Sequence, residues 1–231
     1  MTQTIVALDF SSREETLAFI SKFHQPIYVK IGMELTYACG LDIIKEIKKM
    51  GHKIFLDLKL HDIPNTVKGG MKNLAALGVD IVNLHCAGGI NMMKAEMEGL
   101  REGAIDGNVP LCIGVTQLTS TTKEIMNEEL LIEGEVLDCV LHYALNAKKA
   151  GLDGVVCSVH EVQKIHEICG KDFITVTPGI RLRDDSADDQ KRIATPLYAK
   201  EMGSDYIVVG RSITRSADPK KTYDEIEEML R

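Results

Sequence analysis

The sequence has no apolar run long enough to cross a membrane. No stretch of about 18 apolar residues occurs in the chain, so we expect no transmembrane helix. The N-terminus lacks a basic region followed by a long apolar segment, which predicts that no secretory signal is present. Positive charge is not in excess either: the formal net charge is −7, whereas a nucleic-acid-binding surface is basic and clustered. We therefore expect a cytoplasmic protein that binds neither membranes nor nucleic acids.

Cysteine pairs with metal-binding or redox spacing are also missing. The six cysteines are Cys39, Cys86, Cys112, Cys139, Cys157 and Cys169, and none forms a Cys-x-x-Cys pair. Most stand among apolar residues, which predicts reduced thiols that pack as small hydrophobes in the core. A zinc site needs closer ligand spacing, so we predict no metal site. The dispersed histidines His61 and His85 lie near expected strand ends, where we interpret them as locally satisfied polar residues that could reach a pocket.

Apolar runs of strand length alternate with amphipathic helical segments along the whole chain. The expected strands are residues 4–8, 27–31, 53–58, 81–84, 111–115, 154–157, 173–176 and 206–209. The expected helices are residues 13–23, 41–50, 67–77, 92–100, 136–150, 162–168, 196–202 and 223–230. This alternation predicts a closed (β/α)8 barrel that forms a single catalytic domain over residues 1–231. An open doubly wound sheet is the alternative, although the glycine-rich nucleotide motifs typical of that fold are absent.

Polar residues follow several of the expected strands, at the end where barrel enzymes place their active sites. These residues are Asp9, Lys30, Asp57, Lys59, Thr119, Ser158, Arg181, Gly210 and Arg211. Any one of them alone would more often have a structural role. Their common position at one end of one barrel favours a catalytic site.

Asp57, Lys59 and Asp62 form the most informative motif. Residues i and i+2 of a strand share a face, so Asp57 and Lys59 are expected to point the same way. An ammonium group between two carboxylates stays protonated at neutral pH, which suits it to stabilise and protonate an anion. The alternative is a structural ion pair, with Asp62 serving the first turn of a helix that Pro64 opens.

The loops after the seventh and eighth strands predict a phosphate site. Gly210 allows close backbone approach, Arg211 offers a bidentate partner for phosphate oxygens, and a short helix is expected to start near Ser212. Gln190 could close over the phosphate from a charged segment, residues 181–192. That segment is either a mobile lid or solvated surface. The substrate is therefore predicted to carry a phosphate monoester.

Together these residues resemble the bacterial form of the orotidine 5′-monophosphate decarboxylase family, and the resemblance covers the whole chain. It is carried by Leu8-Asp9, Val29-Lys30-Ile31-Gly32, Asp57-Leu58-Lys59-Leu60-His61-Asp62-Ile63-Pro64-Asn65-Thr66, Thr177-Pro178-Gly179-Ile180-Arg181, Asp189-Gln190-Lys191-Arg192 and Val208-Val209-Gly210-Arg211-Ser212-Ile213. The resemblance implies conversion of orotidine 5′-monophosphate to uridine 5′-monophosphate in pyrimidine biosynthesis, without a cofactor or metal.

The resemblance also implies a role for each site residue. Lys59 would be the proton donor within a charged array that includes Lys30, Asp57 and Asp62. The other implied substrate contacts are Asp9 and Lys30 with the ribose, Gln190, Gly210 and Arg211 with the phosphate, Thr119 and Arg181 with the substrate, and Ser158 with the base. Asp62 and Thr66 would come from the neighbouring subunit of a homodimer with shared active sites.

Two other functions fit part of this pattern. A Mg2+-dependent sugar-phosphate decarboxylase or aldolase of the same superfamily also carries an Asp-x-Lys pair on its third strand. The residues from His61 to Thr66 and the Thr-Pro-Gly-Ile-Arg segment favour the orotidine enzyme over it. A catalytically silent barrel that senses a nucleotide is the second alternative, and the intact Asp57, Lys59 and Asp62 argue against it.

Overall fold

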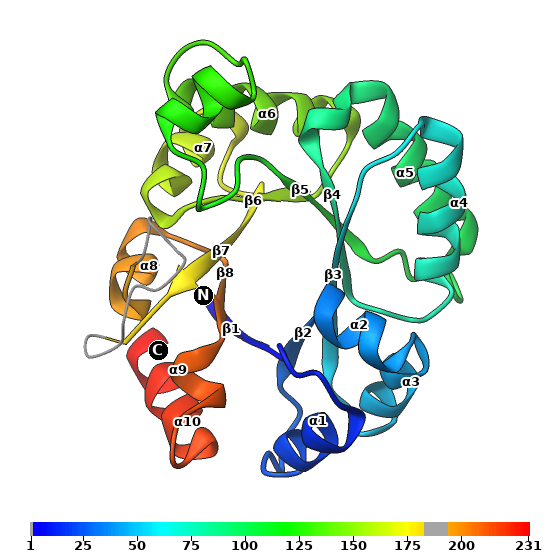
Figure 1. The fold of residues 1–231 in the computed structure, drawn as a ribbon, viewed down its shortest axis with the longest axis vertical. Coiled ribbons are helices and arrows are strands. Elements are labelled where there is room, and N and C mark those ends of the chain that lie inside the picture. Colours follow the sequence, from blue (N-terminus) through cyan, green and yellow to red (C-terminus); the bar gives the residue numbers. More distant parts are fainter. Residues whose placement is uncertain (1, 183–193) are drawn as a thin grey trace.

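A closed barrel of parallel strands forms the centre of the computed structural model, which describes residues 2–182 and 194–231 (Figure 1). Its strands are β1 (Gln3–Ala7), β2 (Tyr28–Gly32), β3 (Lys53–Leu60), β4 (Ile81–His85), β5 (Leu111–Val115), β6 (Gly154–Val156), β7 (Ile174–Ile180) and β8 (Tyr206–Val209). Each strand pairs with the next, and β8 pairs with β1 to close the sheet. The predicted (β/α)8 barrel is confirmed, and the open doubly wound sheet is excluded.

Helices surround the barrel on its outside (Figure 1). They are α1 (Arg13–Ile20), α2 (Met33–Cys39), α3 (Asp42–Lys49), α4 (Pro64–Ala75), α5 (Gly89–Gly103), α6 (Val136–Ala150), α7 (Val162–Cys169), α8 (Pro196–Met202), α9 (Arg211–Thr214) and α10 (Pro219–Leu230). The sequence pattern did not predict α2. It predicted the short α9, and it ended β3 two residues early, at position 58 instead of Leu60.

Two apolar clusters follow from the alternation of side chains along the strands. Residues such as Ile5 and Phe55 point into the barrel, where they pack together as an inner cluster. Their neighbours Val6 and Leu56 point outward and pack against the helices in a larger outer cluster. Both faces of each strand are therefore buried, as expected for a parallel barrel whose strands are covered by helices.

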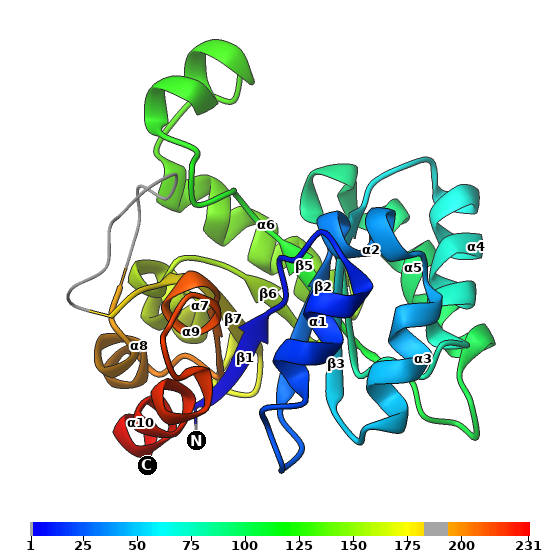
Figure 2. The same ribbon diagram turned by 60° about the horizontal axis from the view of Figure 1, so that its bottom comes forward.

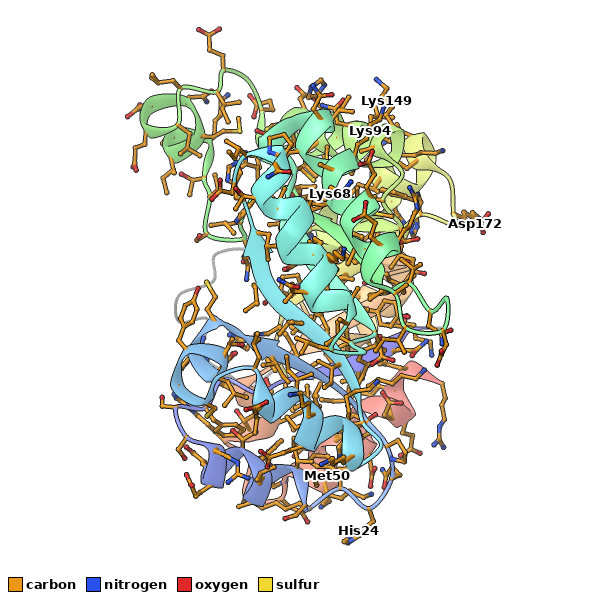
Figure 3. The ribbon with its side chains drawn as sticks, turned by 90° about the vertical axis from the view of Figure 1, so that its right-hand side faces the viewer. His24, Met50, Lys68, Lys94, Lys149 and Asp172 are labelled. Carbon is orange, nitrogen blue, oxygen red and sulfur yellow. The ribbon has the colours of Figure 1, made fainter. Side chains whose placement is uncertain are left out.

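Helices α4 and α5 pack closely side by side on the outside of β3 and β4 (Figure 3). Two glycines of α5 face the backbone of α4: a Cβ added at Gly99 would lie 2.1 Å from the carbonyl oxygen of Lys68, and one at Gly103 would lie 2.0 Å from that of Lys72. Glycine is required at both positions because any side chain would collide with the neighbouring helix. Lys68, labelled in Figure 3, also forms ion pairs with Glu98 and Glu102 of α5.

Aspartates join neighbouring strands at the end of the barrel where the strands begin. The Oδ2 atom of Asp80 accepts a hydrogen bond from the backbone N–H of Ile54 at 2.7 Å. Asp153 accepts in the same way from Cys112 at 2.8 Å, and Asp205 does so from Thr175 at 2.8 Å. Each aspartate is the third residue of a Gly-x-Asp sequence between a helix and a strand. This repeated contact satisfies the N–H group of the second residue in each of the alternate strands β3, β5 and β7.

The segment between β5 and α6 extends away from the barrel at the end where the strands finish (green in Figure 2). It includes a π-helical turn, Ile125–Glu129. Among the described residues, no helix has the length and apolar character needed to cross a bilayer. None of the six cysteines, all of which are among the described residues, forms a disulfide; Cys39 and Cys139 are partly buried, and the others belong to the core.

Candidate active site

A cavity of about 750 Å³ opens at the end of the barrel where the strands finish. Its apolar floor continues the inner cluster through Phe55, Val176 and Val208. Its walls include eight of the residues predicted for the site: Asp9, Lys30, Asp57, Lys59, Thr119, Arg181, Gly210 and Arg211. The structure therefore brings these eight residues together at one end of the barrel.

Four charged side chains form a continuous array along one wall of the cavity. The Nζ atom of Lys59 lies 2.6 Å from Oδ1 of Asp57, and Nζ of Lys30 lies 3.4 Å from Oδ2 of the same carboxylate. Lys30 also contacts Oδ1 of Asp9 at 3.0 Å. Gly32 makes room for this contact, because a Cβ at position 32 would lie only 2.9 Å from Nζ of Lys30. Positive and negative groups therefore alternate from β1 to β3.

Burial and charge act in opposite directions on this array. Burial raises the pKa of Asp57, but Lys30, Lys59 and hydrogen bonds from Lys59 and Asn83 outweigh it, and the pKa lies below its usual range. Burial lowers the pKa of Lys30, but the carboxylates of Asp57 and Asp9 outweigh it and raise the pKa above its usual value. Asp57 is therefore ionised and Lys30 protonated at neutral pH.

An irregular pairing of β3 with β4 aims Asp57 and Lys59 into the cavity. Leu56 pairs with Val82 and Leu60 pairs with Leu84, so the residues from Asp57 to Lys59 stand opposite Asn83 alone. Lys59 has a φ of 53°, in the left-handed region that a non-glycine residue occupies at a cost of about 1–3 kcal/mol. Such bulges often re-aim a side chain beside an active site. Simple strand alternation predicted that Asp57 and Lys59 would meet, but not this backbone.

Asn83 is a site residue that the sequence reasoning missed. It is 1% exposed and lines the cavity from β4. Its Nδ2 donates to Oδ1 of Asp57 at 2.6 Å, and its Oδ1 accepts from the backbone N–H of Lys59 at 2.8 Å. A signal was present in the sequence, because Asn83 is a polar residue at an inward position between the apolar residues Val82 and Leu84.

Three arginines line the opposite part of the cavity: Arg181 after β7, and Arg211 and Arg215 in and after α9. Arg215 was not predicted from the sequence. Gly210 lies beside them, and the fold leaves space for a side chain there, since an added Cβ would lie 3.6 Å from Cβ of Ala7 and 4.0 Å from Oδ2 of Asp9. Ala7 and Asp9 both line the cavity, so a side chain at position 210 would occupy ligand space.

Four predicted residues are not placed on the cavity wall. Asp62 and Thr66 are exposed; Asp62 lies after β3, where its Oδ1 accepts from the backbone N–H of Ile63 at 2.6 Å, and Thr66 lies in α4. Ser158 is fully buried, and its backbone N–H donates to Oε2 of Glu161 at 2.7 Å. Gln190 and most of the charged segment 181–192 lie outside the described residues.

His61 and His85 lie beside the array, with their ring centroids 5.6 Å apart and their planes tilted by 40°. Burial, then His61 and Lys59, lowers the pKa of His85, so that this ring is neutral at pH 7. Within the described part of the chain, no group of three or more His, Cys, Asp and Glu side chains has a metal-binding arrangement.

Comparisons with known proteins agree with this geometry. Residues 2–226 match the model of the orotidine 5′-phosphate decarboxylase / HUMPS family. An orotidine 5′-phosphate decarboxylase of Bacillus cytotoxicus is 55% identical over 97% of this chain and 95% of its own length. The crystal structure of the Lactobacillus acidophilus orotidine 5′-phosphate decarboxylase aligns with a TM-score of 0.90 at 44% identity, covering 99% of this chain and 98% of that one. An uncharacterized protein of Geobacillus kaustophilus aligns with a TM-score of 0.89 at 49% identity, over 99% of this chain and 100% of that one.

Proposed function

Because this chain belongs to the orotidine 5′-phosphate decarboxylase / HUMPS family, we propose that Lys59 stabilises and protonates the carbanion formed from its substrate. The chain is a carboxy-lyase that converts orotidine 5′-monophosphate to uridine 5′-monophosphate in pyrimidine biosynthesis. The observation that carries the proposed mechanism is the array of Asp9, Lys30, Asp57 and Lys59 on one cavity wall.

The chemistry of the reaction requires electrostatic stabilisation. The bond between C6 and the carboxylate breaks with its electron pair left on C6, in the plane of the pyrimidine ring. The ring π system cannot delocalise this pair, so the negative charge must be stabilised by fixed charges around it. Lys59 supplies a positive charge at C6 and then transfers a proton to it. Its contact with Asp57 at 2.6 Å holds the ammonium in place before the substrate reacts.

The other residues predicted for the site bind the parts of the substrate that do not react. Asp9 and Lys30 hold the ribose hydroxyls, and Thr119, Ser158 and Arg181 contact the rest of the nucleotide. Gly210 and Arg211 bind the phosphate together with Gln190, because an arginine fork matches phosphate oxygens in a bidentate manner. Phosphate binding then provides energy that organises the distant charged array.

The active form is a homodimer in which each site includes residues of both subunits. Asp62 and Thr66 are exposed, just beyond the end of β3 that carries Lys59. In a two-fold dimer each subunit would place these two residues in the active site of its partner, because a two-fold interface repeats every contact. They would complete the partner's charged array.

The test is turnover of orotidine 5′-monophosphate by the purified protein in EDTA, followed by the loss of substrate absorbance. We expect full activity, because Lys59 is the proposed stabilising cation and no cofactor is needed. Loss of turnover that Mg2+ restores would contradict the proposed mechanism and favour the metal-dependent chemistry of the sugar-phosphate decarboxylases.

A further inference from the structure

The side chain of Asn83 connects Asp57 and Lys59, the two charged residues that β3 contributes to the cavity wall. It lies opposite the irregular part of β3, where the residues from Asp57 to Lys59 face a single position of β4. One end of its amide contacts the Asp57 carboxylate at 2.6 Å, and the other contacts the Lys59 backbone at 2.8 Å. With an exposed fraction of 1%, Asn83 is shielded from competing water.

The two contacts fix the orientation of the amide. The Lys59 N–H is a donor, so the oxygen of Asn83 must face it. The ionised Asp57 accepts hydrogen bonds only, so the NH2 group must face the carboxylate. Asparagine carries a donor and an acceptor at the end of one short, uncharged side chain. An ionised aspartate has no donor, and serine has a single hydroxyl group that does not offer both in the same geometry.

The backbone contact bears directly on the position of the Lys59 ammonium. With its φ of 53°, Lys59 lies in a region that side chains other than glycine rarely occupy. The hydrogen bond from the Lys59 N–H to Asn83 satisfies the backbone in that conformation. Without this acceptor, the partly buried N–H would favour a different backbone conformation, which would move Nζ away from Asp57.

We propose that Asn83 is a positioning residue for decarboxylation, which holds the Lys59 backbone and the Asp57 carboxylate in the arrangement that places the ammonium at C6. This inference rests on the proposed role of Lys59. Asn83 acts only through Asp57 and Lys59, so its loss should lower kcat more than it weakens binding of the product nucleotide. A residue that merely supports the barrel would instead change stability and leave kcat of the folded enzyme unaltered.

The first experiment compares Asn83→Ala with Asn146→Ala, which changes a half-buried asparagine of α6 that contacts His142 outside the cavity wall. For Asn83→Ala we expect kcat to fall about 10- to 100-fold, similar to the loss of partners that orient metal ligands. The Kd for uridine 5′-monophosphate should change much less, and Asn146→Ala should match the wild type. A folded Asn83→Ala enzyme with wild-type kcat would overturn the proposal.

The second experiment uses Asn83→Asp and its pH dependence. The introduced carboxyl group would lie against Asp57, and two carboxylates in contact cannot both stay ionised. When the pair holds one proton, it restores both the donor toward Asp57 and the acceptor toward Lys59. The ratio of Asn83→Asp to wild-type kcat should therefore rise as the pH falls from about 8 to about 5.5, as this shared proton binds.

Other groups around Asp57 also carry charge or titrate. Dividing the kcat of Asn83→Asp by the wild-type kcat at each pH removes the effect that these groups have on both enzymes. They are Asp9 beyond β1, Lys30 of β2, Lys59 of β3, His61 beyond β3 and His85 of β4. All of them are present in both enzymes, whereas the shared proton exists only in Asn83→Asp. A ratio that does not change with pH would overturn the proposal, and this readout decides the matter if Asn83→Ala does not fold.

A Lys59→Ala enzyme measured in parallel separates this inference from the proposed function. If Lys59→Ala is nearly inactive and the Asn83 variants keep wild-type kcat, only the role of Asn83 is wrong. If Lys59→Ala turns over at nearly the wild-type rate, the mechanism itself is wrong, and the inference about Asn83 is overturned with it.

Discussion

The two ends of the barrel use aspartate in different ways. Where the strands begin, Asp80, Asp153 and Asp205 accept hydrogen bonds from backbone N–H groups of neighbouring strands. Where the strands finish, Asp9 and Asp57 contact lysine side chains at the edge of an open cavity. The same type of side chain therefore joins strands at one end of the barrel and holds lysine ammonium groups in place at the other.

This difference follows from what each end has to satisfy. At the end of the barrel where the strands begin, backbone N–H groups need acceptors, and an aspartate carboxylate in a fixed position supplies one. The other end has the ammonium groups of Lys30 and Lys59, which must be held in place before the substrate arrives, and this requires fixed opposite charges. Stability is therefore expected to depend on the first end and turnover on the second, the usual division of labour in this fold.

The largest expected effect concerns Lys59, at the catalytic end. Lys59→Ala should lower kcat by at least about 1,000-fold, because it removes both the charge that stabilises the carbanion and the proton that quenches it. Binding of uridine 5′-monophosphate should weaken far less, since the product carries no carbanion. The exposed Lys45, which pairs with Asp42 on α3, provides a matched control. A Lys59→Ala enzyme with near wild-type turnover would rule out the mechanism.

The second prediction tests whether the catalytic end is completed by a partner subunit. Lys59→Ala and Asp62→Ala homodimers should each be nearly inactive. If the two are unfolded together and refolded in equal amounts, half of the dimers should be hybrids, and each hybrid should contain one intact site. Activity should then recover to about a quarter of the wild-type value by symmetry counting. No recovery in verified hybrids would place Asp62 and Lys59 in the same subunit's site.

The third prediction concerns the phosphate part of the cavity. Arg211→Ala should weaken binding of uridine 5′-monophosphate by about 10- to 100-fold, the usual loss for a charged hydrogen bond worth about 1.5–3 kcal/mol. Arg211→Lys should bind with intermediate affinity, because it keeps the charge but not the bidentate fork. Calorimetric titration measures both. Equal affinity of wild type and Arg211→Ala would show that Arg211 does not bind the phosphate.

The last prediction concerns stability and not activity, and it involves Glu96 of α5, a carboxyl group away from both ends of the comparison. It is fully buried, and neither oxygen has a hydrogen-bond partner among the described residues. Burial raises the pKa of Glu96 from 4.5 to about 9. The folded protein therefore keeps a proton that the unfolded chain releases, so stability falls as the pH rises from 4.5 to about 9.

Glu96→Gln removes this titration, because the amide carries no charge at any pH in the window. Its free energy of unfolding should increase relative to wild type by up to about 1.4 kcal/mol for each pH unit. Urea unfolding at pH 6 and pH 8 measures the difference, with Glu98→Gln on the exposed face of α5 as the control. The prediction is wrong if the wild type and Glu96→Gln lose stability in parallel with pH.

The sequence predicted the barrel because its alternation of strands and helices is regular and nearly complete. It also located most of the cavity wall, since polar residues such as Asp9 and Lys30 follow apolar strands and are easily recognised. The helix α2 escaped prediction because it directly follows β2 without a connecting turn, so the two patterns merge.

The details of β3 could not be predicted from local sequence. Simple alternation brings Asp57 and Lys59 to one face, but the bulge lies opposite Asn83 of another strand, which accepts a hydrogen bond from the left-handed backbone of Lys59. Such tertiary contacts override local preferences. Asp62 and Thr66 also matched the motif without reaching the cavity wall of their own chain.

The comparison between the two ends is tested most directly by measuring kcat and the free energy of unfolding for Asp57→Asn and Asp153→Ala. Asp57→Asn should lose at least about 100-fold in kcat even at temperatures where it is fully folded, because it removes the carboxylate that holds the Lys59 ammonium in place. Asp153→Ala should lose about 1–3 kcal/mol of stability and keep wild-type kcat at temperatures where it is folded. If folded Asp57→Asn kept wild-type kcat, or if folded Asp153→Ala lost as much kcat as Asp57→Asn, the division of roles between the two ends would be wrong.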